Sequence, residues 1–170
     1  MRDSLRWERD ASFTAFMLEA QPSLLRTAYF LSGDPDLARE LVQDALVRTY
    51  MAWPKVRQET ATAYARRILV NGRADHARRL RREVPSPILR EVRAEADTSH
   101  LEREQLVALL VQLPEQQRKV IVLRYCVDLS ERQTAELLGL SVGGVKSSAS
   151  RGLAVLRRLT ISSERKVHER

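Results

Sequence analysis

Apolar residues recur at the three- and four-residue spacing of a helix through most of the chain, and no stretch alternates with the period of two that is typical of a strand. The expected helices cover residues 13–31, 36–53, about 59–82, 101–113, 115–127, about 130–138 and about 142–158. The pattern therefore predicts an all-α fold.

One segment breaks this pattern. Residues 83–99 are rich in proline and charge and poor in apolar side chains, which is typical of a linker. We therefore expect two helical domains, at residues 10–83 and 101–160, joined by a flexible linker at residues 84–100. Within the first domain, Asp34 and Asp36, on either side of Pro35, are placed to cap the helix expected at residues 36–53 and to complement its dipole.

Charge is unevenly distributed along the chain. Basic residues outnumber acidic ones by 29 to 22, a formal net charge of +7, and a GC-rich genome alone can produce the strong bias toward arginine. The net charge is +4 over residues 1–83, −2 over residues 84–104 and +5 over residues 105–170. Two basic blocks on either side of an acidic joint indicate two units that each contact a polyanion.

The most specific local pattern lies between residues 130 and 156. Ser130 and Gln133 have the spacing of a capping box at the start of a helix. Gly139 suits the left-handed position that ends this helix, and Ser141 can cap the next one. A helix, a glycine turn and a second helix predict a helix-turn-helix motif.

Projection of the second helix at about 100° per residue separates two faces. The expected core side carries Val142, Val145, Ala149, Leu153 and Leu156. The opposite side carries Gly143, Lys146, Ser147, Ser150 and Arg151, and no acidic residue. A small, hydroxyl-rich surface with two cations can approach base edges in a major groove. The alternative is a solvated helix with a basic edge.

A second basic helix lies in the first domain. The segment from Tyr64 to Arg82 holds seven arginines and one acid, and Arg67, Asn71 and Arg78 share the face opposite its packed side. An amide and several guanidinium groups, flanked by the Tyr64 ring, can bind an unpaired nucleic-acid strand by stacking and charge neutralisation. The alternative is an ordinary charged face in solvent.

Enzyme chemistry and membrane insertion are not expected. Cys126 is the only cysteine, which excludes a disulfide framework and fits a reducing compartment. The histidines lack metal-ligand spacing, and no phosphate-binding glycine loop is present. The apolar run Leu106–Val111 is too short to span a membrane, and the charged N-terminus lacks the apolar core of a secretory signal. We expect a soluble cytoplasmic protein without catalytic activity, metal or cofactor.

Three sequence blocks resemble bacterial sigma factors of the extracytoplasmic-function type, the class of the sigma-70 family that keeps only regions 2 and 4. LLRTAYFLSGDPDLARELVQDALVRTYMAW is similar to regions 2.1–2.2, and TAYARRILVNGRADHARRLRR is similar to regions 2.3–2.4. LPEQQRKVIVLRYCVDLSERQTAELLGLSVGGVKSSASRGLAVLRRL is similar to region 4. The residues of these blocks are most similar to the sigma-E-like subgroup common in actinobacteria.

The resemblance implies roles for individual residues. The positions that dock on the clamp coiled coil of the polymerase β′ subunit are Glu40, Leu41, Val42, Gln43, Asp44, Arg48 and Trp53. The positions that capture the melted −10 element are Tyr64, Arg67, Asn71, Asp75 and Arg78. The positions that read the −35 element are Gly143, Gly144, Lys146, Ser147, Ser150 and Arg151. The chain departs from the family at Tyr64, where many relatives have tryptophan, and at Gly144, where threonine or serine is usual.

The resemblance also implies partners, namely the β and β′ subunits of core RNA polymerase, promoter DNA and an anti-sigma factor. Two alternatives stay open at this point. One is a helix-turn-helix regulator with an N-terminal dimerisation domain, which binds a palindromic site as a dimer. The other is a small nucleic-acid enzyme or RNA-binding module, which requires a nucleophile or metal ligands.

Overall fold

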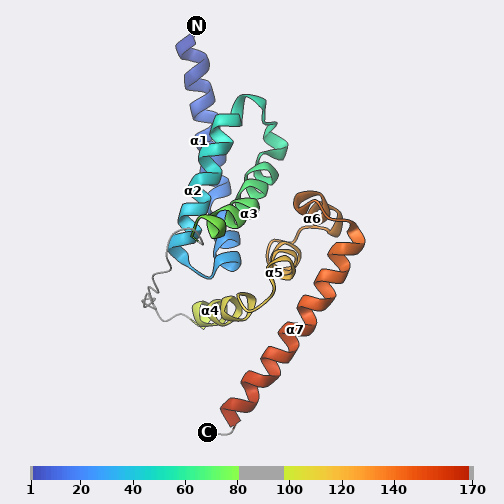
Figure 1. Ribbon diagram of the computed structural model, residues 1–170. Helices are drawn as coiled ribbons and strands as arrows, with labels where there is room; N and C mark the ends of the chain where they lie inside the picture. The colour runs from blue at the N-terminus through green and yellow to red at the C-terminus, as the bar shows by residue number, and fades with distance from the viewer. Residues whose placement is uncertain (1, 81–97, 169–170) are drawn as a thin grey trace. The chain divides into compact units, whose positions relative to one another are not determined.

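The computed structural model describes the backbone of residues 2–80 and 98–168, and the side chains of residues 7–72 and 101–162. The chain divides into two compact units, Met1–Ala77 and Arg78–Arg170, which are considered separately below. Every regular element in the described ranges is helical, which confirms the all-α prediction (Figure 1). Most of the expected linker, residues 84–97, lies outside the described residues.

The first unit consists of three α-helices and two short 3-10 turns. They are α1 (Arg2–Ser32), α2 (Pro35–Ala52), η1 (Trp53–Lys55), η2 (Gln58–Thr60) and α3 (Ala61–Leu80). Gly33, with φ of 75°, ends α1 and donates its N–H to Tyr29 O at 2.8 Å. Asp34 then caps α2 as expected, because its carboxylate accepts the N–H groups of Asp36 and Leu37.

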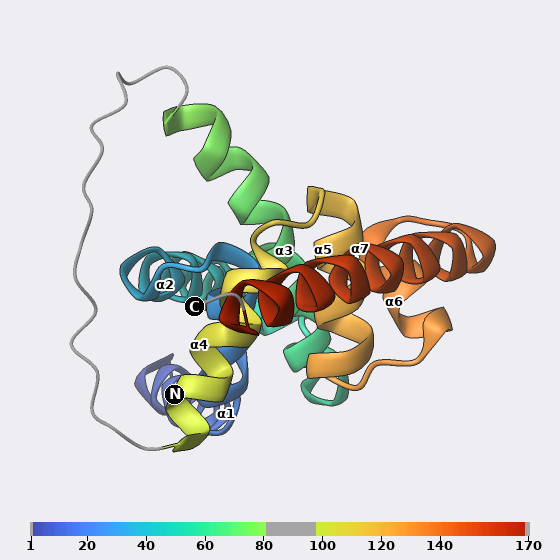
Figure 2. The same ribbon diagram turned by 90° about the horizontal axis from the view of Figure 1, so that it is seen from below.

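Helices α1 and α2 pack along each other (Figures 1 and 2) and are joined by an aromatic cluster. The Trp53 ring lies 5.2 Å from the Phe13 ring and 5.0 Å from the Phe16 ring, measured between centroids. Its indole N–H donates to Ser12 Oγ at 2.9 Å, so this large buried side chain has a polar partner. Trp53 therefore joins the end of α2 to the middle of α1.

A polar network joins the same two helices beside the cluster. The Tyr50 hydroxyl donates to Asp10 Oδ1 at 2.6 Å and accepts from Arg9 Nη2 at 2.6 Å. The Arg9 guanidinium also lies over the Tyr50 ring, 4.9 Å from its centroid. The bonded residues are about forty positions apart in sequence.

The second unit contains a helix-turn-helix whose second helix is long. Its elements are α4 (Thr98–Leu110), α5 (Glu115–Ile121), η3 (Val122–Cys126), α6 (Glu131–Leu138) and α7 (Val142–His168). Several expected boundaries are wrong. In the first unit, α1 begins at Arg2 rather than at residue 13, and in the second, α4 begins and ends three residues before the expected 101–113. The helix expected at 115–127 becomes a π-helical turn after Ile121, and the last helix continues to His168 rather than ending at about 158.

The π-helical turn η3 redirects the chain toward α6. The Val127 N–H donates to Val122 O at 3.0 Å, five residues back, and the next residue, Asp128, is left-handed with φ of 59°. The Leu129 N–H then donates to Leu123 O at 2.9 Å. These two bonds give the last carbonyl groups of the helix hydrogen-bond partners while the chain turns.

The predicted caps of the helix-turn-helix are confirmed. Ser130 Oγ accepts the Gln133 N–H at 3.1 Å, and Gln133 Oε1 accepts the Ser130 N–H at 2.8 Å, which completes the capping box. Gly139 is left-handed, with φ of 66°, and Ser141 Oγ accepts the Gly144 N–H at 3.0 Å. The starts of α6 and α7 are thus each capped by a serine side chain, and α6 ends at a left-handed glycine.

Candidate nucleic-acid interface

The first turns of α7 present the face that sequence projection selects. Gly143, Lys146, Ser147, Ser150 and Arg151 are all exposed. On the opposite side, Val145, Ser148, Ala149 and Gly152 are buried, and Val145 and Ala149 pack with Val120 and Ala135 of the neighbouring helices. Gly144 lies between the two sides and is half-buried. Val142 is an exception to the predicted core side, because it stands at the exposed first turn and keeps 41% of its surface accessible.

Gly152 lets α7 approach α5 closely. A methyl group on Gly152 would lie 2.9 Å from Ile121 Cγ1 and 3.4 Å from Gln117 Cβ. Real Cβ atoms do not come that near, so a side chain here would push the helices apart. The sequence pattern did not identify Gly152 as a packing residue; its signal is its place three residues after Ala149 on the packed side.

A neighbouring helix adds an acidic residue beside the α7 face. The exposed face of α7 has no acid of its own, but Lys146 Nζ lies 3.6 Å from Glu131 Oε2, at the start of α6. Arg151 turns back on its own helix and donates from Nε to Ser147 O at 3.2 Å. The face itself thus carries no acidic residue, but the turn places an acid of the neighbouring helix beside it.

The first part of α3 presents a second polar face. Tyr64, Arg67 and Asn71 are exposed, with 39% of the Tyr64 surface accessible, as the projection predicts. The backbone of Asp75 and Arg78 belongs to α3, but their side chains lie outside the described residues. The three described side chains offer a ring, a guanidinium and an amide at positions 64, 67 and 71, which one helix face brings together.

Arg66 was not singled out from the sequence. It is 9% exposed, and burial lowers the pKa of its guanidinium from the usual value because the charged form loses solvation. Its position gives a signal, since Leu69 and Val70, three and four residues later, are both buried. Arg66 therefore belongs to the packed side of α3 rather than to its polar face.

A mixed polar and apolar face runs along α2. Glu40, Gln43, Asp44 and Arg48 are exposed, and Arg48 Nε lies 3.0 Å from Asp44 Oδ2. Two further exposed residues on this helix are apolar, Val47 and Met51, with 51% and 77% of their surfaces accessible. They follow Gln43 and Asp44 at helical spacing, a signal that the sequence interpretation did not use. Three of the positions implied by the resemblance, Leu41, Val42 and Trp53, are buried and support this face from beneath.

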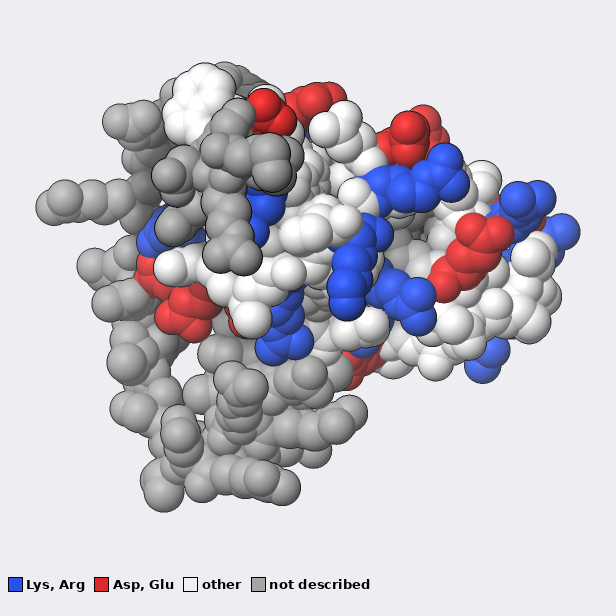
Figure 3. All heavy atoms as spheres, turned by 90° about the horizontal axis from the view of Figure 1, so that it is seen from above, with Lys and Arg blue, Asp and Glu red and all other residues white. Residues whose placement is uncertain are grey.

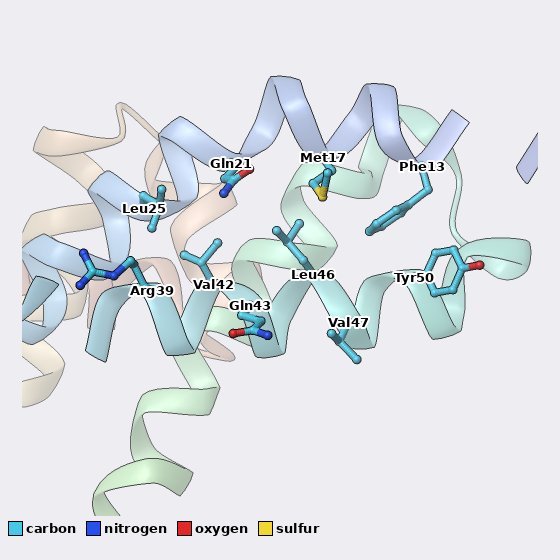
Figure 4. A pocket seen from close by; sticks show the side chains of 10 residues that line it. All are labelled: Phe13, Met17, Gln21, Leu25, Arg39, Val42, Gln43, Leu46, Val47 and Tyr50. Carbon is cyan, nitrogen blue, oxygen red and sulfur yellow. The ribbon is translucent and has the colours of Figure 1, made fainter. Parts of the chain in front are cut away.

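A groove between α1 and α2 adjoins this face. Figure 4 shows Phe13, Met17 and Leu25 of α1 opposite Val42, Leu46 and Tyr50 of α2. Its volume is about 470 Å³, and Arg39, Gln43 and Val47 complete the side formed by α2. The surface of α2 thus combines exposed charges, two exposed apolar side chains and an apolar hollow.

The surface charge does not form one positive field. Figure 3 shows acidic side chains lying among the lysines and arginines on the face seen from above.

Within the described residues, no set of three histidine, cysteine or acidic side chains is placed to hold a metal ion. No described helix is long and apolar enough to cross a membrane.

Comparisons with known proteins identify both units. The model of Sigma-70 region 2 matches residues 16–83, and the model of Sigma-70, region 4 matches residues 103–156. The RNA polymerase sigma-E factor of Streptomyces avermitilis is 40% identical over 149 residues, covering 85% of this chain and 83% of the relative. The ECF RNA polymerase sigma factor EcfG of Rhodopseudomonas palustris is 32% identical over 148 residues, covering 84% and 82%.

Solved structures agree with this assignment. The sigma factor RpoE of Bartonella quintana, in complex with the anti-sigma factor NepR, shares the fold with a TM-score of 0.72 at 24% identity, over 88% of this chain and 96% of that chain. CnrH, in complex with the cytosolic domain of CnrY, gives a TM-score of 0.67 at 25% identity over 90% of each chain. With regions 2 and 4 matched in order and a sigma-E factor as a relative over most of its length, the chain belongs to the extracytoplasmic-function class of sigma-70 factors, the subunits that direct RNA polymerase to promoters.

Proposed function

We propose that the two polar helix faces divide promoter recognition between them. Residues 10–83 act as the domain that binds core polymerase and captures the −10 strand, and residues 101–160 act as the −35 reader, with residues 84–100 as the linker. The observation that carries this proposal is the matching of one exposed polar face to each sigma region, on α3 in the first and on α7 in the second.

The −35 assignment rests on the shape of the α7 face. Glycine and serine leave the backbone of the helix close to a partner surface, so that Lys146 and Arg151 are the long side chains able to reach phosphates or guanine. Gly144 is half-buried, and a Cβ there would lie 3.2 Å from the capping Ser141 Oγ. A larger residue at this position would therefore crowd the cap of the recognition helix.

The −10 assignment rests on the different chemistry of the α3 face. The Tyr64 ring can stack on an unpaired base, the Asn71 amide can hydrogen-bond to a base edge, and Arg67 can neutralise the backbone. Such a set suits a melted strand, whose bases are not paired with each other, better than a closed duplex. Asp75 and Arg78 complete the face in the proposal.

The polymerase-binding assignment rests on α2. Its exposed charges surround Val47 and Met51, and apolar anchors within a polar rim are typical of a protein interface. Leu41 and Trp53 act in this proposal by holding α2 in place, since both are buried. Met51 is the more exposed of the two apolar residues, so Met51→Ala tests this surface without disturbing the core.

The chain acts, in this proposal, as a non-catalytic subunit in the cytoplasm, because the polymerase performs the chemistry on chromosomal DNA. An anti-sigma factor is proposed as a further partner. Its support is that RpoE and CnrH, which share the fold, are each solved in complex with another protein, NepR being an anti-sigma factor.

Run-off transcription with core polymerase tests the division of labour. Arg151→Ala weakens binding to the closed promoter about tenfold, as expected for one lost base or phosphate contact. Asn71→Ala leaves that affinity unchanged and lowers open-complex formation, followed by permanganate reactivity of the melted strand. Arg157→Ala, an exposed arginine further along α7, is the matched control for charge. Equal effects of Arg151→Ala and Asn71→Ala on closed-complex affinity contradict the proposal, and failure of the wild-type chain to direct any initiation overturns it entirely.

A further inference from the structure

Glu131 lies beside one of the two cations on the α7 face. Its Oε2 is 3.6 Å from Lys146 Nζ, and the two residues come from the two helices of the helix-turn-helix. Their side chains are 39% and 62% exposed, so the pair is open to solvent and weak enough to exchange partners. A phosphate that approaches Lys146 therefore competes with a carboxylate that is already there.

The position of the Glu131 carboxylate depends on the start of α6 and on the packing of α6 against α7. Glu131 is the first residue of α6, directly after Ser130, whose capping box fixes the helix start. Below it, Ala135 of α6 and Val145 of α7 share one buried cluster, so the two helices keep their spacing. Lys146 has a long flexible stem, whereas the start of α6 does not move with it.

We propose that Glu131 is a specificity-determining residue of the −35 reader. Glu131 orients Lys146 and lowers the affinity of the domain for DNA of the wrong sequence. The inference rests on the proposed role of α7. On a cognate site, Glu131 holds the Lys146 ammonium in the orientation that contacts the DNA. The binding free energy gained from this orientation offsets the repulsion between Glu131 and the phosphates. On other sequences only the competition and the repulsion remain.

A simpler role for Glu131 is stabilisation of α6, because a carboxylate at the first turn interacts favourably with the helix dipole. That role predicts a change in stability and none in sequence preference. The chain offers a matched control in Glu136, which also lies on α6 but pairs within its own helix, with Arg132 Nε at 3.2 Å. Glu131→Gln and Glu136→Gln remove the same charge from the same helix.

The experiment uses holoenzyme assembled from core polymerase and the full chain, with a promoter fragment selected from a random pool by the wild-type holoenzyme. Closed-complex affinity is measured for this fragment and for the same fragment with a scrambled −35 segment. We expect Glu131→Gln to strengthen binding of the scrambled fragment about threefold, to leave the selected fragment nearly unchanged, and so to lower the affinity ratio about threefold. Glu136→Gln leaves the ratio at the wild-type value.

A second background makes the test specific to the pair. In Lys146→Met holoenzyme, Glu131→Gln has no further effect on the ratio if the two residues act together. An equal change in both backgrounds, or equal ratios for Glu131→Gln and Glu136→Gln, overturns the inference and leaves only an effect of net charge. A wild-type ratio of one overturns the assignment of α7 as the −35 reader, which is the failure of the proposed function itself.

Discussion

The two units of this sigma factor position their helices in different ways. In the second unit, the start of α7 is positioned by contacts within a few residues, such as the Ser130–Gln133 capping box and the bond from the Gly144 N–H to Ser141. In the first unit, α1 and α2 are joined by side chains about forty residues apart, through Tyr50 and Trp53. The comparison teaches that a helix of a proposed functional surface can be positioned by local caps, as α7 is, or by contacts between residues distant in sequence, as α2 is.

The largest expected effect comes from removing the long-range contact of the first unit. Trp53→Ala removes the indole that contacts Phe13 and Phe16, and we expect it to lower the free energy of unfolding by about 3–5 kcal/mol. Hydrogen exchange followed by mass spectrometry should show faster exchange in α1 and α2 and unchanged exchange in α5 to α7.

Trp7→Ala is the matched control, because Trp7 is 73% exposed while Trp53 is 7% exposed. The control should leave the stability within about 0.5 kcal/mol of the wild-type chain. If Trp53→Ala keeps full stability but loses binding to core polymerase, the residue acts at the polymerase surface and not as the support inferred from its burial.

An intermediate effect is expected at the contact between α5 and α7. Gly152→Ala places a methyl group 2.9 Å from Ile121 Cγ1, and overpacking of this kind lowers the free energy of unfolding by about 1–3 kcal/mol although alanine favours helices. Chemical denaturation measures the loss. It also sharpens the comparison, because it tests a long-range contact in the unit whose recognition helix begins at a local cap.

Gly143→Ala provides the control on the same helix. The nearest atom to a new Cβ there is Ser141 Oγ at 4.0 Å, so helix propensity alone should raise stability by about 0.5–1 kcal/mol. If both substitutions stabilise the chain, the close approach at Gly152 is relieved by a small shift of the helices and does not limit their packing.

The smallest effect concerns the capping box. Ser130→Ala removes the oxygen that accepts the Gln133 N–H, and we expect a loss of about 1 kcal/mol, with faster hydrogen exchange confined to the first turn of α6. Ser150→Ala, on the exposed face of α7, is the control and should leave stability unchanged. Faster exchange throughout α6 and α7 would show that the local cap supports the whole motif, and the distinction between the units would weaken.

Much of the fold was predictable because helical periodicity and caps are short-range signals. The spacing of Ser130 and Gln133 and the glycine at position 139 predict the helix-turn-helix from residues that are close together in the chain. The π-helical turn after Ile121 was not predictable, since it depends on how α5 meets the following turn. The exposed face of α3 was predicted, but the burial of Arg66 was not, because a helical projection treats every arginine as a candidate for solvent.

The sequence by itself determined the all-α class and which face of α7 meets solvent, because both depend on periodicity along one helix. The order of the two sigma regions followed from the resemblance of the sequence blocks to the family. Only the tertiary structure decided what lies beside these faces. It placed Glu131 next to Lys146, buried Leu41 and Trp53 beneath the α2 surface, and opened a groove between α1 and α2. The physical reason is that neighbours across a turn or a helix pair are fixed by packing between elements, which a projection of one helix does not contain.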